Sequence, residues 1–158
     1  MNAVDAIARA IYVVAMALVF GGTAALSFAT APQVFRTLKP AEAGTLFGKV
    51  LRVFDAMAQV ASTIAVVAAV VGILPSVGPA PVARLVLACS VLVVILVLRR
   101  SVAPQMAALK PPVSEDEARR WDPESKKRFD ALHKRYVALY SANLFLSLAA
   151  LVLGAAPL

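Results

Sequence analysis

Polar side chains recur at helical spacing in, and just before, two of the apolar stretches of this chain. They are Asp55 and Gln59 in the first half, and Asp130, His133, Tyr140 and Asn143 in the second half. Separations of three, four and seven residues bring side chains onto one face of an α-helix. Polar groups within an apolar span turn toward the protein interior, because lipid offers them no hydrogen-bond partner. These residues therefore predict a polar seam, open toward the cytoplasm, that binds or passes a small solute or a metal cation.

The same side chains also have a structural interpretation. Asp55 and Asp130 can pair with basic residues at the level of the lipid headgroups, and Tyr140 can belong to the aromatic belt of the interface. Asn143 can make a hydrogen bond between helices. In that case the protein is a non-catalytic structural or accessory membrane subunit, or an oligomerising scaffold that docks a second copy or another membrane protein. The sequence leaves both functions open.

Metal-ligating residues are scarce. His133 is the only histidine and Cys89 the only cysteine, which excludes bis-histidine haem ligation and a thiolate cluster within one chain. Met57 and Met106 are expected near the depth of His133, and two thioethers with an imidazole suit copper(I). A copper(I) site at these three residues is the metal hypothesis, and no resident cofactor is predicted.

No catalytic signature is present. The sequence contains no P-loop, no glycine-rich dinucleotide turn, no HExxH motif and no serine elbow. The net charge of +7 is not accompanied by the interleaved aromatic and basic residues of a nucleic-acid surface. Gly44 and Gly48 form a GxxxG pattern, which favours close helix packing. The sequence therefore predicts a non-enzymatic protein with no nucleic-acid partner.

The composition is that of an integral membrane protein. Of the 158 residues, 61% are hydrophobic, and the mean hydropathy is +0.81, whereas a soluble domain is roughly 45–50% apolar. The surplus apolar surface must face lipid, so residues 1–158 are expected to form a single membrane domain. Spans are predicted at residues 10–31, 55–75, 80–100 and 136–154, with cytoplasmic loops at 32–54 and 101–135.

The distribution of basic residues predicts the orientation. Four spans place both termini on one side together with the loop between the second and third spans, and that side carries only Arg9 and Arg84. The other 14 of the 16 lysines and arginines lie on the opposite side, which the positive-inside rule makes cytoplasmic. Both termini are therefore expected outside. The composition, rich in Ala, Val and Arg, suggests a bacterial inner membrane, whose anionic lipid headgroups would attract the basic side.

Two tripeptides occur twice in the same order. Ala-Pro-Gln stands at 31–33 and 103–105, and Phe-Asp-Ala stands at 54–56 and 129–131, so the offsets are 72 and 75 residues. This order indicates a duplicated two-helix unit. The predicted fold class is an all-α integral membrane four-helix bundle built from two pseudo-repeated helical hairpins.

The segments Pro-Gln-Val-Phe at 32–35, Ala-Gly-Thr-Leu-Phe-Gly-Lys at 43–49 and Phe-Asp at 54–55, with Phe-Asp-Ala-Leu-His at 129–133, carry a family resemblance. The chain resembles the transmembrane-protein-205-like family, a four-span membrane domain of unknown function, from about residue 10 to residue 154. The resemblance implies a four-helix membrane bundle with Pro32, Gly44, Phe54 and His133 at matching positions. It implies no established reaction, and eukaryotic relatives are associated with resistance to a platinum drug. The sequence departs from the family at Tyr136, where a small polar residue is usual.

Overall fold

The computed structural model describes residues 3–74, 78–111 and 121–156, and within them every regular element is a helix. The helices are α1 (Ala3–Ala24), η1 (Ala25–Thr30), α2 (Ala31–Thr37), α3 (Pro40–Ile73), α4 (Pro79–Val97), η2 (Leu98–Val102), α5 (Ala103–Leu109) and α6 (Pro123–Ala155). Here η1 and η2 are π-helical segments. They join their neighbours into continuous helices, so four long apolar helices result: Ala3–Thr37, Pro40–Ile73, Pro79–Leu109 and Pro123–Ala155. The predicted all-α membrane bundle is confirmed.

The four long helices exceed the thickness of a bilayer. At about 1.5 Å per residue, helices of 31 to 35 residues extend about 47–53 Å, against roughly 30 Å for the hydrocarbon core. Most of the expected loops at 32–54 and 101–135 are consequently helical, although residues 112–120 lie outside the described residues. The limits of the membrane-embedded parts stay predictions.

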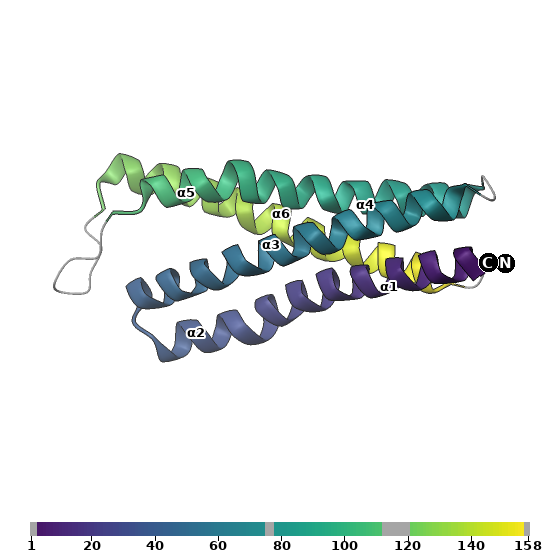
Figure 1. Ribbon diagram of the computed structural model, residues 1–158. Helices are drawn as coiled ribbons and strands as arrows, with labels where there is room; N and C mark the ends of the chain where they lie inside the picture. Colours follow the sequence, from purple (N-terminus) through teal and green to yellow (C-terminus); the bar gives the residue numbers. More distant parts are fainter. Residues whose placement is uncertain (1–2, 75–77, 112–120, 157–158) are drawn as a thin grey trace.

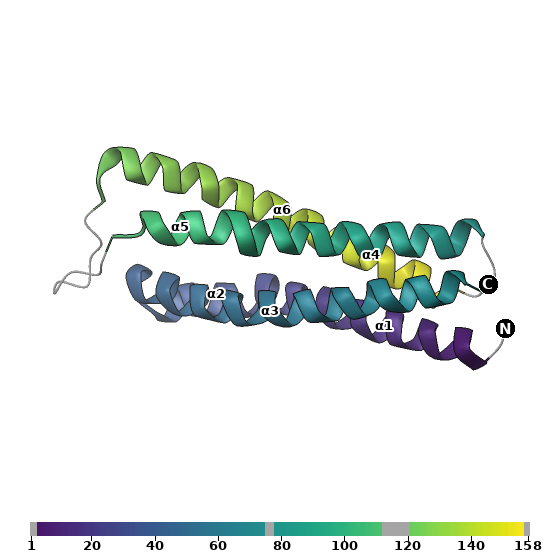
Figure 2. The same ribbon diagram turned by 45° about the horizontal axis from the view of Figure 1, so that its top comes forward.

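The helices form a ring in which sequence neighbours are also spatial neighbours. α1 packs against α3, α3 against α4, α4 against α6, and α6 closes the ring on α1. Figure 1 and Figure 2 show the two ends of the chain at the same end of the bundle. α1 and α4 are thus diagonal to each other, as are α3 and α6. A duplicated hairpin would produce this order, but so would any bundle with alternating helix directions, so the duplication stays a prediction.

Each Ala-Pro-Gln tripeptide follows a π-helical segment. The backbone N–H of Ala31 donates to the carbonyl of Leu26, and that of Ala103 donates to Leu98, both five residues earlier. A proline inside an α-helix has no N–H to donate, and its ring clashes with the carbonyl four residues before. The wider π turn accommodates Pro32 and Pro104 without ending either helix.

The interior of the bundle is built from small side chains. Along α3 the buried residues are mostly alanines, and they pack against Tyr12, Met16 and Val19 of α1 and against Val91 and Ile95 of α4. Large apolar side chains are instead exposed on the outer faces of the helices, for example Leu18 and Phe145. Small residues let helix backbones approach closely, and exposed large apolar residues suit contact with lipid. The four helices therefore belong in a membrane.

Two arginines close the end of the bundle that carries the termini. The Arg9 guanidinium donates to the carbonyls of Gly154 (2.8 Å), Ala155 (2.8 Å) and Ala156. Arg84 is buried, and its Nε donates to the carbonyl of Leu153 at 3.2 Å. The last carbonyls of a helix have no intrahelical donor and carry a partial negative charge. Both arginines thus complete the C-terminal end of α6.

Candidate functional site: a buried polar cluster

Asp55 is the carboxylate that the fold buries in the bundle. Only 5% of its surface is exposed, and its Oδ2 accepts a hydrogen bond from the Tyr136 hydroxyl at 3.3 Å. Because α3 and α6 are diagonal in the ring, this bond crosses the interior of the bundle. A buried carboxylate needs several donors or a counter-charge to offset its lost hydration. The single bond from Tyr136 leaves most of its acceptor capacity unused.

Two further polar groups of α6 lie on the same face as Tyr136. The Tyr140 ring stacks on the Tyr136 ring with centroids 5.8 Å apart, and Asn143 is 2% exposed. Within the described residues, neither the Tyr140 hydroxyl nor the Asn143 Oδ1 has a hydrogen-bond partner. Such buried unpaired groups are rare and require an explanation.

Thr23 of α1 adds a third helix to the site. Its hydroxyl is buried and donates to the carbonyl of Val19 at 2.7 Å, so its oxygen keeps a lone pair for another group. The Tyr140 hydroxyl lies close to Thr23 and to Asp55 without the geometry of a hydrogen bond to either. We call Thr23, Asp55, Tyr136, Tyr140 and Asn143 the polar cluster.

A close contact between α1 and α3 positions two members of the polar cluster. A Cβ atom at Gly22 would lie 2.2 Å from Cε2 of Phe54, so only glycine leaves room for the ring. Thr23 follows Gly22 and Asp55 follows Phe54, and both are buried. The glycine therefore sets the spacing at which α1 and α3 bring Thr23 and Asp55 into the interior.

Gln59 occupies the margin of the polar cluster. It lies one turn beyond Asp55 on α3, is half-buried, and accepts a hydrogen bond on Oε1 from Nη1 of Arg99 in η2. Arg99 is close enough to Asp55 to attract it electrostatically. Its guanidinium nevertheless donates to the Gln59 amide oxygen and forms no direct ion pair with Asp55.

The structure does not bring Asp130 and His133 into the polar cluster. Both side chains are exposed, and the His133 ring stacks on Phe129 with centroids 6.1 Å apart. At about 100° per residue, Asp130 is rotated by about 120° and His133 by about 60° from Tyr136 around α6. The expected seam along α6 therefore includes only Tyr140 and Asn143 of its four predicted members.

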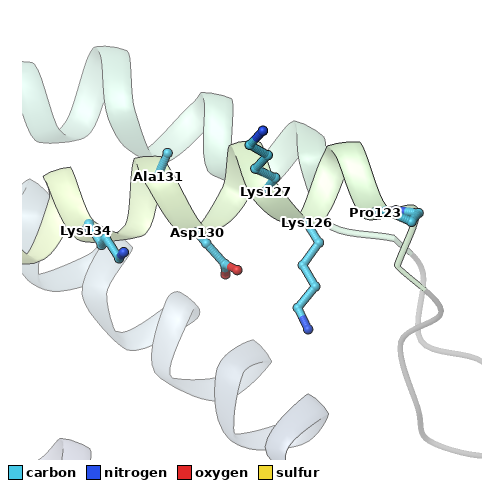
Figure 3. A pocket seen from close by; sticks show the side chains of 6 residues that line it. All are labelled: Pro123, Lys126, Lys127, Asp130, Ala131 and Lys134. Atoms are coloured by element: carbon cyan, nitrogen blue, oxygen red, sulfur yellow. The ribbon is translucent and has the colours of Figure 1, made fainter.

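Asp130 instead lies among lysines. An open hollow of about 510 Å³ is lined by Pro123, Lys126, Lys127, Asp130, Ala131 and Lys134. Figure 3 shows Lys126 and Asp130 extending to one side of α6 and Lys127 to the other. These residues lie in the N-terminal part of α6, before Tyr136. They form a charged surface near the expected headgroup level.

The three residues of the copper(I) hypothesis differ in their burial. Met57 is 64% exposed on the outer face of α3, because two residues after Asp55 correspond to a rotation of about 200°. Met106 is half-buried and packs in the cluster that contains Tyr136, whereas His133 is exposed. Among the residues that the structure describes, no three His, Cys, Asp or Glu side chains are grouped to hold a metal ion.

The sequence interpretation missed Thr23 and did not select Tyr136. It sought the seam on the second and fourth spans only, although a hydroxyl next to two glycines in an apolar span is a signal for a close helix contact. Two more buried polar residues, Ser62 and Ser147, bond to carbonyls of their own helices, at Ala58 (2.6 Å) and Leu144 (3.0 Å). Their hydroxyls thus have acceptors within their own helices.

The fold and the polar cluster define a four-helix integral membrane protein with buried polar residues in its interior. The chain belongs to the family described as a domain of unknown function, DUF4149, whose model matches residues 14–112. This match includes Thr23, Asp55 and Gln59 and ends before α6. No curated protein and no solved structure matches the chain, and the transmembrane-protein-205-like name is not confirmed.

Proposed function

We propose that this multi-span membrane protein binds or passes a small polar solute or cation at the polar cluster. The observation that carries the proposal is the pair of unpartnered polar atoms, the Tyr140 hydroxyl close to the buried Asp55 and the Asn143 Oδ1 on the same face of α6. Leaving a buried polar group unpaired costs about 1–3 kcal/mol. A bound solute that supplies the missing partners would recover that cost. Gln59 stays a candidate at the margin of this site.

The alternative is a structural or accessory subunit, or an oligomerising scaffold. It is favoured by the alanine-rich core and by the bond between Tyr136 and Asp55, which can fix the register of α3 and α6 without any ligand. Under this alternative the interior is dry, and the partner is a second copy or another membrane protein. The two functions therefore differ in whether water and small ions reach the polar cluster.

The proposed setting is a bacterial inner membrane with both termini outside and no enzymatic activity. The basic residues of 32–54 and 101–135 would then meet the anionic headgroups of the cytoplasmic leaflet. The use of Arg9 and Arg84 as partners for the end of α6 supports this orientation. Arg9 and Arg84 bind carbonyls at the end of α6, and this structural role explains why two basic residues stand on the side that the positive-inside rule makes external.

Cysteine accessibility distinguishes the two functions. In a Cys89→Ala background, Asn143→Cys would be treated in inverted membrane vesicles with the cationic reagent methanethiosulfonate ethyltrimethylammonium. Ala150→Cys is the matched control, because Ala150 is also buried in α6, one turn beyond Ser147. Thr23→Cys probes the same level from α1.

We expect Asn143→Cys and Thr23→Cys to react and Ala150→Cys to stay unmodified until the protein is denatured in SDS. A polar path to the cluster would produce this difference. If all three cysteines react only after denaturation, the interior is dry and the accessory function is correct. Size-exclusion profiles equal to that of the parent protein would establish that the variants are folded.

A further inference from the structure

We infer that the polar cluster is a site for a monovalent alkali-metal cation. This inference rests on the proposed function and names the class of ligand. A carboxylate, a phenolic oxygen and a hydroxyl oxygen, from Asp55, Tyr140 and Thr23, lie close together. The buried Asn143 supplies an amide oxygen about one turn beyond Tyr140 on α6. Hard cations of groups 1 and 2 prefer oxygen ligands of these kinds, and the set contains no thiolate or imidazole that would favour a transition metal.

Several oxygens of the polar cluster keep free lone pairs. The Tyr136 hydroxyl donates to Asp55 and the Thr23 hydroxyl donates to Val19, whereas the Tyr140 hydroxyl and the Asn143 amide also carry donors of their own. Among the described residues, the Asn143 Oδ1 accepts from no group and the Asp55 carboxylate accepts from Tyr136. A positive ion that binds several oxygens at once would use these lone pairs.

The charge of the polar cluster indicates a single positive charge. Asp55 is the only carboxylate buried among the described residues. In a low-dielectric interior a site close to neutrality is strongly favoured over one that holds a net charge. One carboxylate is neutralised by a monovalent ion, whereas a divalent ion would leave an excess positive charge and an anion would double the negative one.

The nearest protein cation is kept from neutralising Asp55. Arg99 attracts Asp55 electrostatically, yet its Nη1 donates to the Gln59 Oε1. Arg99 lies in η2, whose Leu98 and Val102 pack against Tyr136, and π-helical segments occur often at functional sites. Gln59 is therefore a positioning residue, since it holds the guanidinium at the margin and leaves the carboxylate to the ion.

The purified full chain in detergent tests this inference through its thermal stability in sodium chloride and in potassium chloride. Choline chloride at equal ionic strength is the reference. A ligand that binds only the folded protein raises the midpoint of unfolding with its concentration. We expect one or both alkali salts to raise the midpoint above that in choline chloride, and Asp55→Asn to weaken apparent binding at least roughly tenfold.

Matched variants make the test specific. Glu42→Gln removes an exposed carboxylate of α3 and should keep the full response. Tyr140→Phe deletes a single oxygen and should weaken binding several-fold, so the test survives if Asp55→Asn does not fold. Gln59→Leu should also weaken binding, because Arg99 is then free to pair with Asp55, and adding Arg99→Gln should restore it.

Three results would overturn the inference. They are no alkali-specific stabilisation of the wild type, an unchanged response in both Asp55→Asn and Tyr140→Phe, or a larger stabilisation by magnesium chloride at equal ionic strength. If Asn143→Cys is accessible while the alkali response is absent, the proposed function holds for another solute and only this inference fails. If the cysteine is inaccessible as well, both fail.

Discussion

Replacing Gly22 by alanine tests the helix contact that positions the polar cluster. The new Cβ would lie 2.2 Å from Cε2, 2.9 Å from Cζ and 3.1 Å from Cδ2 of Phe54. Either the ring must turn away or α1 and α3 must separate. Separation of the helices would displace the carboxylate of Asp55, which follows Phe54 directly, whereas rotation of the ring would disturb the packing of Phe54 alone. Gly21, the adjacent residue, offers a matched control because a Cβ there meets nothing within 4 Å.

The magnitude follows from two opposing effects. Overpacking a well-packed interior costs about 1–3 kcal/mol, whereas alanine is favoured over glycine within a helix by about 0.8–1.0 kcal/mol. Gly22→Ala should therefore lower the free energy of unfolding by up to about 2 kcal/mol. Gly21→Ala should leave it unchanged or raise it by up to about 1 kcal/mol.

Reversible unfolding of the purified protein in mixed micelles with increasing SDS measures both free energies. Phe54→Leu shortens the opposing side chain, so Gly22→Ala should cost less in that background, and the double-mutant cycle gives the coupling between the two positions. Equal free energies for Gly22→Ala and Gly21→Ala would refute the argument. An undiminished cost of Gly22→Ala in the Phe54→Leu background would refute it as well.

Three further variants test other contacts by the same SDS titration. Arg9→Ala should lower the free energy of unfolding by about 1.5–3 kcal/mol, because charge-assisted hydrogen bonds to the end of α6 are lost, whereas exposed Arg100→Ala should not. Gly154→Ala should destabilise, since its Cβ would lie 2.8 Å from Cε1 of the buried Tyr12, whereas Gly72→Ala has open space. Tyr136→Phe should destabilise by about 1.5–3 kcal/mol through the bond to the carboxylate that it removes.

Each of these expectations has a clear contrary result. An Arg9→Ala protein as stable as Arg100→Ala would mean that solvent replaces the guanidinium at the carbonyls. Equal free energies of unfolding for Gly154→Ala and Gly72→Ala would mean that the Tyr12 side chain can move aside without destabilising the protein. Unchanged stability of Tyr136→Phe would show that the Asp55 carboxylate is satisfied by other groups.

The four apolar helices could be predicted from the sequence because each is marked by a long run of apolar residues, and no single residue decides the prediction. About 20 apolar residues in succession leave few other structures in a membrane. The start of α6 was also accessible, since Asp122-Pro123 is a helix-start pattern and α6 begins at Pro123 with Asp122 as its N-cap. The spans predicted at 10–31 and 80–100 end before Pro32 and Pro104, but a π turn before each proline carries the helix onward. Backbone adjustments of this kind leave no trace in hydropathy.

The polar cluster could be predicted only in part because helical phase drifts with distance. Three residues fall about 60° short of a full helical turn. Asp130 and His133 are separated from Tyr136 by such steps of three, so their side chains are rotated away from the interior. Asp55 and Asn143 were found because single polar residues inside apolar spans have few alternatives to burial. Thr23 could be assigned to the polar cluster only with the knowledge that α1 packs beside α3, and the packing of the helices is not visible in the sequence.

The most direct test of cation binding at the polar cluster is anomalous diffraction from crystals of the wild-type protein grown with thallium(I), a monovalent ion that substitutes for alkali metals. The account predicts an anomalous peak inside the bundle, within coordination distance of the Asp55 carboxylate and the Asn143 Oδ1. An interior without such a peak, in which both oxygens are satisfied by protein groups alone, would contradict it.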